Sequence, residues 1–411
     1  MIIILQSLIT FFIKDLFLNL SLYSFFLVII NFFVVSYYLF NTVKREWFIL
    51  IYIGFVARII VMFIDLYVPS IEIFGSGSDT EYFHEASMSI ANGLIPLSDG
   101  RTFYVTVLSG LYYLFGDQRL FAQFLNIVLW VFSAVYLYKS LILFEVQRKV
   151  VFLALSLFIF MPNGMFMSSI LLRESIIVFF ITLSLFRFLK WLKYKSTKDY
   201  VSALILALVS MVFHAGMVGF LIGYIITFIF VGKEKLAKKK SDSVIFFMLI
   251  IAIAILLFYN NEIFLTKFNT LEETGIKSIN LSNYGESAYL QSFSTLSSWK
   301  VFLLTPLKMV YFLFSPLPTD WRGMSDIASF LFDSLIYIFL IVSITIGSMK
   351  SKMDSKIIIS ILVIVVICTF IYAYGTGNAG TAIRHRNKLL PLFLMTFGLF
   401  SGNRVRKQKK I

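Results

Sequence analysis

Long apolar runs separated by short polar segments make up nearly the whole chain. A membrane span needs roughly 20 apolar residues, so this pattern predicts an all-α integral membrane bundle, forming a single transmembrane domain over residues 1–411. The runs predicted to cross singly are Leu16–Phe40, Trp47–Val68, Leu120–Phe144, Val150–Met167, Ile170–Leu192, Val244–Tyr259, Ile327–Gly347, Ile357–Tyr374 and Leu389–Phe400. Tyr200–Val231 predicts a hairpin of two short helices bending near His214.

These runs amount to about 11 spans, or 12 if residues 1–13 cross rather than lie in the interface. Thr102–Phe115 and Val301–Phe314 are predicted to have both ends outside, so we expect interfacial or re-entrant helices there.

Basic clusters between the runs set the orientation, because cytoplasmic loops are enriched in Lys and Arg. They are Lys44-Arg45, Arg148-Lys149, Arg187–Lys198, Lys233–Lys240, Lys350–Lys356 and Arg404–Lys410. The chain is 59% hydrophobic and carries a net charge of +14, but its cations lie mainly in these loops, which excludes nucleic acid as the expected partner. The single Cys368 can form no intramolecular disulfide.

The first long polar segment on the predicted outer face is Gly75–Glu85. Ser78 with Glu81 three residues later matches a capping box, which predicts a helix ending at Asn92-Gly93. Asp79 and Glu81 therefore either cap this helix or act on a ligand. Within the preceding run, Arg58 is predicted to face the bundle interior and to pair with Asp65, seven residues later on the same helical face.

The same topology places most of the other charged and histidine side chains on the outer face. Arginine recurs there, and its planar donor fork suits phosphate groups. The candidate catalytic residues are Asp79 and Glu81, and the candidate substrate-binding residues are Tyr82, His84, Arg173, Glu174, His214, Arg322, Arg384, His385 and Arg386. The glycine-rich stretch Tyr374–Ala382 precedes the last three and is either a ligand-binding turn or a simple turn.

Several short motifs carry a family resemblance over residues 54–394. They are Gly77-Ser78-Asp79 with Tyr82 and Ala86, Leu111–Gly116, Leu171–Glu174, Phe314–Pro318, and Arg384-His385-Arg386 before Pro391. The arrangement resembles membrane glycosyltransferases of the GT-C type and the related bacterial O-antigen and capsule repeat-unit polymerases. The chain departs from that pattern in its extra N-terminal hydrophobic segment and in lacking a large soluble C-terminal domain.

This resemblance implies an enzyme of the bacterial cytoplasmic membrane with an extracytoplasmic active face. It would transfer a sugar or oligosaccharide from a polyprenyl phosphate or diphosphate carrier to an acceptor hydroxyl, as a polymerase or single-sugar transferase. Asp79 would be the base, and Arg173, Arg384 and Arg386, with Arg322 in addition, would bind the leaving phosphate. Membrane lipids and other polysaccharide-assembly proteins are the remaining expected partners.

No cofactor is expected. A divalent metal near His84, Glu85, His214 or Asp79 remains open, although no ligand spacing supports one. The alternative function is a lipid-linked oligosaccharide flippase or another multi-span transporter, which would place ionisable residues along a path through the membrane.

Overall fold

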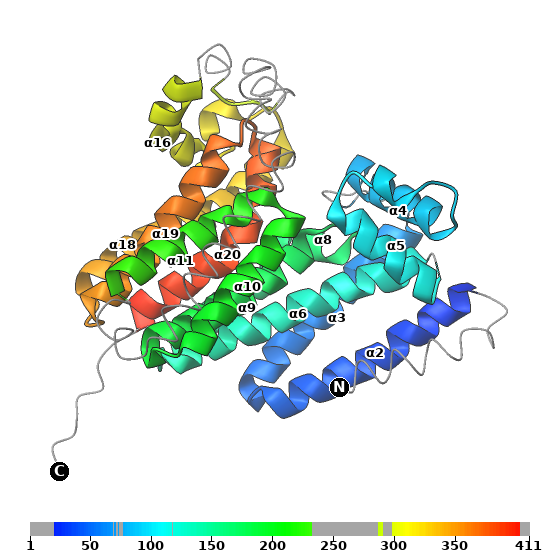
Figure 1. The fold of residues 1–411 in the computed structure, drawn as a ribbon, viewed down its shortest axis with the longest axis horizontal. Coiled ribbons are helices and arrows are strands. Elements are labelled where there is room, and N and C mark those ends of the chain that lie inside the picture. The colour runs from blue at the N-terminus through cyan, green and yellow to red at the C-terminus, as the bar shows by residue number, and fades with distance from the viewer. Residues whose placement is uncertain are drawn as a thin grey trace. The chain divides into compact units, whose positions relative to one another are not determined.

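The computed structural model describes residues 20–68, 70, 73, 77–116, 118–231, 287–290 and 298–402. Helices account for nearly all of this part of the chain, as Figure 1 shows, and the predicted all-α class is confirmed. Within the described residues there is no β-strand, and one isolated antiparallel bridge joins Ala288 to Asn378.

The chain divides into two compact units, and each is described separately. The first unit comprises residues 1–138 and 155–179, and the second comprises residues 139–154 and 180–411. Their boundary falls inside three helices, which are α6, α7 and α9.

The helices that begin in the first unit are α2 (Leu20–Thr42), α3 (Arg45–Tyr67), α4 (Ser78–Ala91), α5 (Phe103–Phe115), α6 (Arg119–Leu143), α8 (Pro162–Ser169) and α9 (Glu174–Tyr194), with a 3-10 turn η2 at Leu97–Asp99. α4 and α5 pack on each other as a hairpin. Its interface includes Phe83 edge-on to Tyr104 and a hydrogen bond from Ser87 Oγ to the Val105 carbonyl oxygen.

The second unit holds the helices α10 (Thr197–Phe213), α11 (Val218–Val231), α16 (Ser298–Phe314), α17 (Met324–Ser329), α18 (Leu335–Lys350), α19 (Ser355–Tyr374) and α20 (Ala379–Gly402), and α7 (Arg148–Phe160) begins in it. The turns η3 (Ala215–Met217) and η5 (Pro318–Asp320) are 3-10, and Phe330–Ser334 forms a π-helical turn between α17 and α18.

Two glycines on α11, the second helix of the predicted hairpin, explain how that helix packs on α19. A Cβ on Gly219 would lie 3.1 Å from Cys368 Cα, and one on Gly223 would lie 3.2 Å from Ile364 Cα. This small-xxx-small spacing lets α11 approach α19 closely, as in many membrane helix pairs. The predicted bend is confirmed, because α10 ends at Phe213 and α11 begins after the His214 turn.

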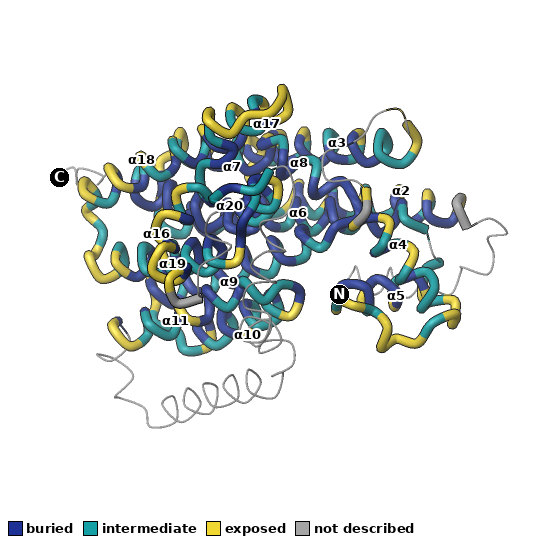
Figure 2. The backbone as a smooth tube through the Cα atoms, turned by 90° about the horizontal axis from the view of Figure 1, so that it is seen from above, coloured by how far each residue is buried: buried dark blue, intermediate teal, exposed yellow. Residues whose placement is uncertain are grey.

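Six of the described helices are long and apolar enough to cross a membrane, and a seventh span results if the pair α7 and α8, bent by 49°, counts as one. Only 33% of the apolar window of α2 and 28% of that of Met324–Lys350 are buried. Exposed positions are coloured yellow in Figure 2, and many of those on these helices are large apolar residues, which are suited to lipid rather than to water. The multi-pass membrane class is therefore supported.

Several sequence predictions need correction or lie outside the description. The last apolar run does not begin at Leu389, because α20 starts at Ala379 and carries Arg384–Lys388 inside the helix. The Val150–Met167 run forms two helices that are broken at Met161 and bent by 49°, which makes it either one broken span or a re-entrant pair. Residues 1–13 and the runs Val244–Tyr259 and 260–286 lie outside the described residues.

Candidate functional site

The helix predicted in the polar segment that begins at Gly75 is present as α4, but its N-terminal cap differs from the predicted one. Ser78 is the first helical residue and Gly77 is the N-cap. Thr80 Oγ1 accepts a hydrogen bond from the Gly77 amide at 3.0 Å and donates to its carbonyl oxygen at 2.8 Å. The Ser78 and Glu81 capping box is therefore wrong. Gly77 has φ +129°, a conformation that favours glycine over residues with a Cβ.

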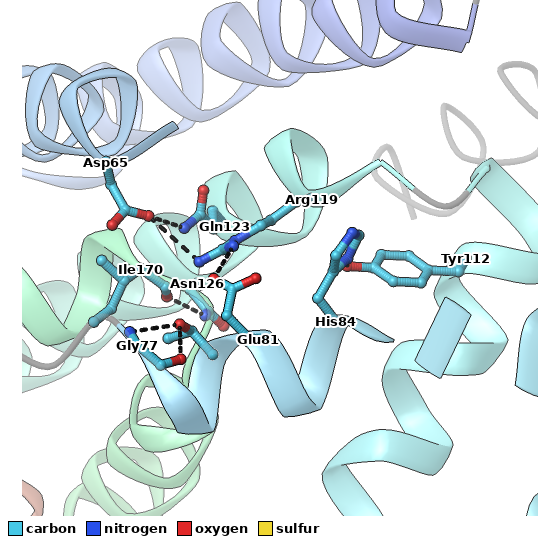
Figure 3. Close-up of polar contacts among 10 residues, drawn as sticks. Asp65, Gly77, Glu81, His84, Tyr112, Arg119, Gln123, Asn126 and Ile170 are labelled. Atoms are coloured by element: carbon cyan, nitrogen blue, oxygen red, sulfur yellow. Dashed lines mark hydrogen bonds and ion pairs between the residues drawn. The ribbon is translucent and has the colours of Figure 1, made fainter. Parts of the chain in front are cut away.

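Because Glu81 does not cap α4, its carboxylate can contact another helix. Arg119, the first residue of α6, donates from Nη1 to Glu81 Oε1 at 2.7 Å, and its Nη2 lies 3.7 Å from Asp65 Oδ2. Gln123 Nε2 donates to the same Asp65 oxygen at 2.7 Å. Figure 3 shows Arg119 between the two carboxylates. Asp79 lies exposed in the first turn of the same helix α4.

The other candidates on α4 have structural neighbours on or beside α5. His84 Nδ1 lies 2.8 Å from the Tyr112 hydroxyl. The Tyr82 hydroxyl accepts from the Arg101 amide at 3.2 Å, and the Arg101 guanidinium lies 5.6 Å from the centre of the Tyr82 ring. Both side chains thus help to hold the α4–α5 hairpin together.

Arg173 and Glu174 lie where α9 begins. Asn126 on α6 fixes the preceding turn, because its Nδ2 donates to the carbonyl oxygens of Ile170 at 3.0 Å and Leu172 at 2.9 Å. Glu174 is fully buried. The Arg173 guanidinium is half-buried and makes no hydrogen bond or ion pair with the described residues. It is thus an arginine whose guanidinium donors are not used by the described residues.

Tyr104 connects this turn electrostatically to the hairpin. Burial raises the pKa of its hydroxyl well above the usual value, the nearby Asn126 amide acts in the opposite direction, and the charge of Glu174 raises the pKa further. The phenol therefore stays protonated at neutral pH and is not suited to act as a base.

Arg58 faces the interior of the first unit as predicted, with 1% of its surface exposed, but its predicted pairing with Asp65 is wrong. Its Nε donates to Ser168 Oγ at 2.9 Å and its Nη1 to the Gly54 carbonyl oxygen at 3.0 Å. The guanidinium also lies 5.6 Å from the centre of the Trp130 ring. Asp65 pairs instead with Arg119, because Gln123 and Arg119 both reach it from α6.

In the second unit the fold brings together His214 and His385, which are distant in sequence. Their ring centres lie 5.0 Å apart. His214 Nδ1 accepts from the Gly216 amide at 3.2 Å. Thr376 Oγ1 donates to the Tyr372 carbonyl oxygen at 2.7 Å and lies 3.0 Å from His385 Nδ1, so His385 donates from Nδ1. The Nδ1 atoms of the two rings therefore have opposite hydrogen-bonding roles.

Two of the predicted phosphate-binding arginines are held by carboxylates. Arg322 donates from Nε and Nη2 to both oxygens of Asp326, at 2.9 and 2.8 Å. Arg386 and Asp333 form an ion pair in which both side chains are fully buried. Arg386 also donates to the carbonyl oxygens of Phe312 and Ser315, which joins α20 to the end of α16 and to the π-helical turn. Arg384, on α20 as well, is half-buried.

The candidates thus fall into separate groups. Asp79, Glu81, Tyr82, His84, Arg173 and Glu174 belong to the first unit, whereas His214, Arg322, Arg384, His385 and Arg386 belong to the second. Sequence reasoning missed Thr80, Tyr104, Gln123 and Asn126. A signal existed for two of them, because Gln123 and Asn126 follow Arg119 by four and seven residues, a polar line on one face of an apolar helix.

A metal site finds no support in this arrangement. In the part of the chain that is described, no three His, Cys, Asp or Glu side chains are grouped so that they could hold a metal ion.

Comparison with known proteins adds no identification. No protein-family model matches the chain, and neither a curated protein nor a solved structure is significantly similar to it. The resemblance drawn from short motifs therefore stands on those motifs alone, and the function is inferred from the residues.

Proposed function

We propose that this protein is a membrane-embedded glycosyltransferase of bacterial surface polysaccharide assembly. Its donor is a sugar or oligosaccharide on a polyprenyl phosphate or diphosphate, and its acceptor is a hydroxyl at the extracytoplasmic face of the cytoplasmic membrane. The observation that carries the proposal is Arg173, a half-buried arginine whose guanidinium has no partner among the described residues. Such a group is suited to a phosphate oxygen, to which arginine binds through two donors.

The reaction needs a base and a stabilised leaving group. The proposed base, the Asp79 carboxylate, takes the proton of the acceptor hydroxyl as its oxygen bonds to the anomeric carbon of the donor sugar. The bond from that carbon to the phosphate oxygen breaks, and the lipid phosphate leaves with the bonding electrons. Cationic donors lower the barrier by binding the charge that develops on the leaving oxygen. Exposed Asp79 in the first turn of α4 supports the assignment of the base.

Among the arginines, Arg173 in the first unit is the leading phosphate ligand. In the second unit, Arg322 donates from Nε and Nη2 to Asp326, and Arg386 is fully buried beside Asp333, so a phosphate would have to displace a carboxylate at either one. Arg384, His214 and His385 also belong to the second unit and stay candidates for substrate binding.

A transporter is the second candidate, and a specific feature favours it. Arg58, Asp333 and Arg386 are all buried in helices, and charges inside membrane helices often mark a transport path. However, Arg386 and Asp333 pair with each other, and Arg58 donates two hydrogen bonds. These contacts support a role in helix packing.

The deciding experiment is a product assay with purified protein, a polyprenyl-linked donor and an acceptor, read by mass spectrometry of the lipid-linked product. Arg173→Gln should weaken donor binding strongly, and Arg173→Lys should weaken it about 10- to 150-fold, which corresponds to losing one charged hydrogen bond. Lys198→Gln is the matched charge control, because Lys198 is exposed in a segment predicted to be cytoplasmic. Donor movement across a vesicle membrane without a new glycosidic bond would replace the enzyme by the transporter.

A further inference from the structure

One face of α6 carries a line of polar side chains in an otherwise apolar helix. Arg119, Gln123 and Asn126 are spaced by four and three residues, so they project from the same side. Gln123 and Asn126 are buried, and Asn126 has only 4% of its surface exposed. Burying polar groups in such a helix is costly unless they form hydrogen bonds. The hydrogen-bond partners of these side chains therefore indicate their structural role.

The partners belong to the two elements that carry the proposed base and phosphate ligand. At the outer end of the line, Arg119 binds Glu81, which lies two residues after Asp79 on α4. At the inner end, the Asn126 amide donates to the carbonyl oxygens of Ile170 and Leu172 in the turn that leads into Arg173. Figure 3 shows Arg119, Gln123 and Asn126 on α6, with their partners Glu81, Asp65 and Ile170.

The two carboxylates at Arg119 differ in their exposure. The Asp65 side chain is 4% exposed and is also held by Gln123, whereas the Glu81 side chain is 51% exposed. The buried contact therefore fixes Arg119 on α3, and the exposed one fastens α4 to Arg119. Because Glu81 is used in this contact, it is poorly placed to act as a second base.

We propose that Arg119 and Asn126 are positioning residues, which hold the α4–α5 hairpin and the turn before Arg173 in register on α6, with Glu81 as the clamp on the hairpin side. This assignment rests on the proposed function for its catalytic consequence. Its structural part, that Glu81 and Arg119 hold α4 in place, is independent of the reaction.

The structural part is tested by amide hydrogen exchange of residues 78–91 in the detergent-solubilised full chain. Glu81→Ala and Arg119→Ala should each speed exchange about two- to fivefold, the range expected for an exposed ion pair, and the double variant should exchange no faster than either. Glu81→Gln should exchange near the wild-type rate, because its amide oxygen still accepts from Arg119. Unchanged exchange in both alanine variants, or effects that add in the double variant, would overturn the clamp.

Turnover separates positioning from direct catalysis. Glu81→Ala should lower kcat about tenfold or more with little change in KM for the lipid donor, and Glu81→Gln should restore most of it. If Gln were as inactive as Ala while α4 exchanged normally, Glu81 would be a catalytic residue and the proposal would fail. If wild-type protein formed no product at all, the proposed function would fail, and the exchange result would still decide the clamp.

The inner end of the line has its own variants. Asn126→Ala removes the amide that holds the turn before Arg173, so KM for the donor should rise more than kcat falls. Asn126→Leu keeps a side chain of similar size and removes only the donor to the two carbonyl oxygens, which makes it the variant to use if Asn126→Ala does not fold. Ser133→Ala is the matched control, because Ser133 is buried on α6 and bonds only locally, to the Leu129 carbonyl oxygen. An equal change in the control, or a KM unaltered in both test variants, would remove Asn126 from this role.

Discussion

Asp79 and Glu81 lie two residues apart, but their surroundings give them different roles. Both lie exposed on α4, and the Glu81 carboxylate accepts a hydrogen bond from Arg119 at 2.7 Å. At the scale of single residues, this contact ties Glu81 to α6, which is why Asp79 is the proposed base. The arginines also differ, since Asp326 binds Arg322 and Asp333 binds Arg386, whereas the Arg173 guanidinium has no partner among the described residues.

Asp79→Asn is expected to remove most glycosyl transfer while leaving the fold intact. The amide keeps the shape of the carboxylate and cannot accept the acceptor proton, and a general base typically contributes about 100- to 10,000-fold in rate. The measurement is initial rate with the lipid-linked donor, with the melting temperature as the check on folding. Wild-type turnover in this variant would reduce Asp79 to a residue of the helix end.

Helix packing in the second unit depends on ions as well as on apolar surface. The Arg386 and Asp333 pair joins α20 to the π-helical turn, and Arg386 also reaches two carbonyl oxygens near the end of α16. A buried pair adds little compared with apolar packing, but losing one partner leaves a buried charge. The pair therefore specifies how these helices meet.

Arg386→Met should destabilise the protein by about 3–5 kcal/mol, because it removes the cation that pairs with Asp333. The double variant Arg386→Met with Asp333→Leu should recover most of that loss. Arg58→Met is the contrast, since Arg58 forms no ion pair with the described residues and its hydrogen-bond partner Ser168 also donates to the Gly164 carbonyl oxygen. Its melting temperature in detergent should fall less than that of Arg386→Met, and an equal fall would contradict this account.

A second ion pair, between Arg187 and Asp199 at the start of α10, makes the stability of the fold depend on pH. Partial burial acts to raise the pKa of Asp199, but the hydrogen bond from Arg187 and the charge of Lys190 hold that pKa below its usual value of 3.8. A carboxyl with a lowered folded-state pKa stabilises the fold above the unfolded pKa and loses that effect as the pH falls through the folded one.

Asp199→Asn should therefore melt at a lower temperature than wild type at pH 7 and at pH 5, and the difference should shrink as the pH is brought below about 4. Thermal melts in one detergent at these pH values measure it. Asp354→Asn is the control variant, because Asp354 is an exposed carboxylate at the cap of α19 that accepts a hydrogen bond from the Lys356 backbone amide. A difference that grew on acidification would reverse the sign of this argument.

At the scale of the whole molecule, the order of basic loops and apolar runs along the sequence predicts two membrane sides. Lys198 and Lys352 are exposed in segments predicted to be cytoplasmic, whereas Asp99 is exposed beyond α4 on the predicted outer side. All the residues proposed for chemistry are predicted to face the side of Asp99. Localisation of the activity outside the cytoplasm thus depends on this orientation.

Substituted-cysteine labelling checks the orientation in intact cells. In a Cys368→Ala background, which removes the buried native thiol, Asp99→Cys should react with a membrane-impermeant maleimide. Lys198→Cys and Lys352→Cys should react only after the cells are permeabilised. Labelling of Asp99→Cys that also required permeabilisation would place the proposed site in the cytoplasm and exclude the polysaccharide role.

The sequence by itself determined the helical membrane class, the hairpin that bends at His214, and the helix from Ser78 to Asn92-Gly93. These features follow from apolar run length, glycine position and local polarity, all of which act over a few turns. Tertiary structure alone decided the partners of the charges. Arg58 and Asp65 share a helical face, yet Asp65 pairs with Arg119 because α6 brings a cation and an amide closer to it. Likewise, the position of Arg386 just before the last apolar run predicted a phosphate-binding residue at the membrane surface. In the structure, packing against the π-helical turn buries Arg386 beside Asp333. Pairing of buried charges depends on which helices meet, and a residue spacing within one segment carries no information about that.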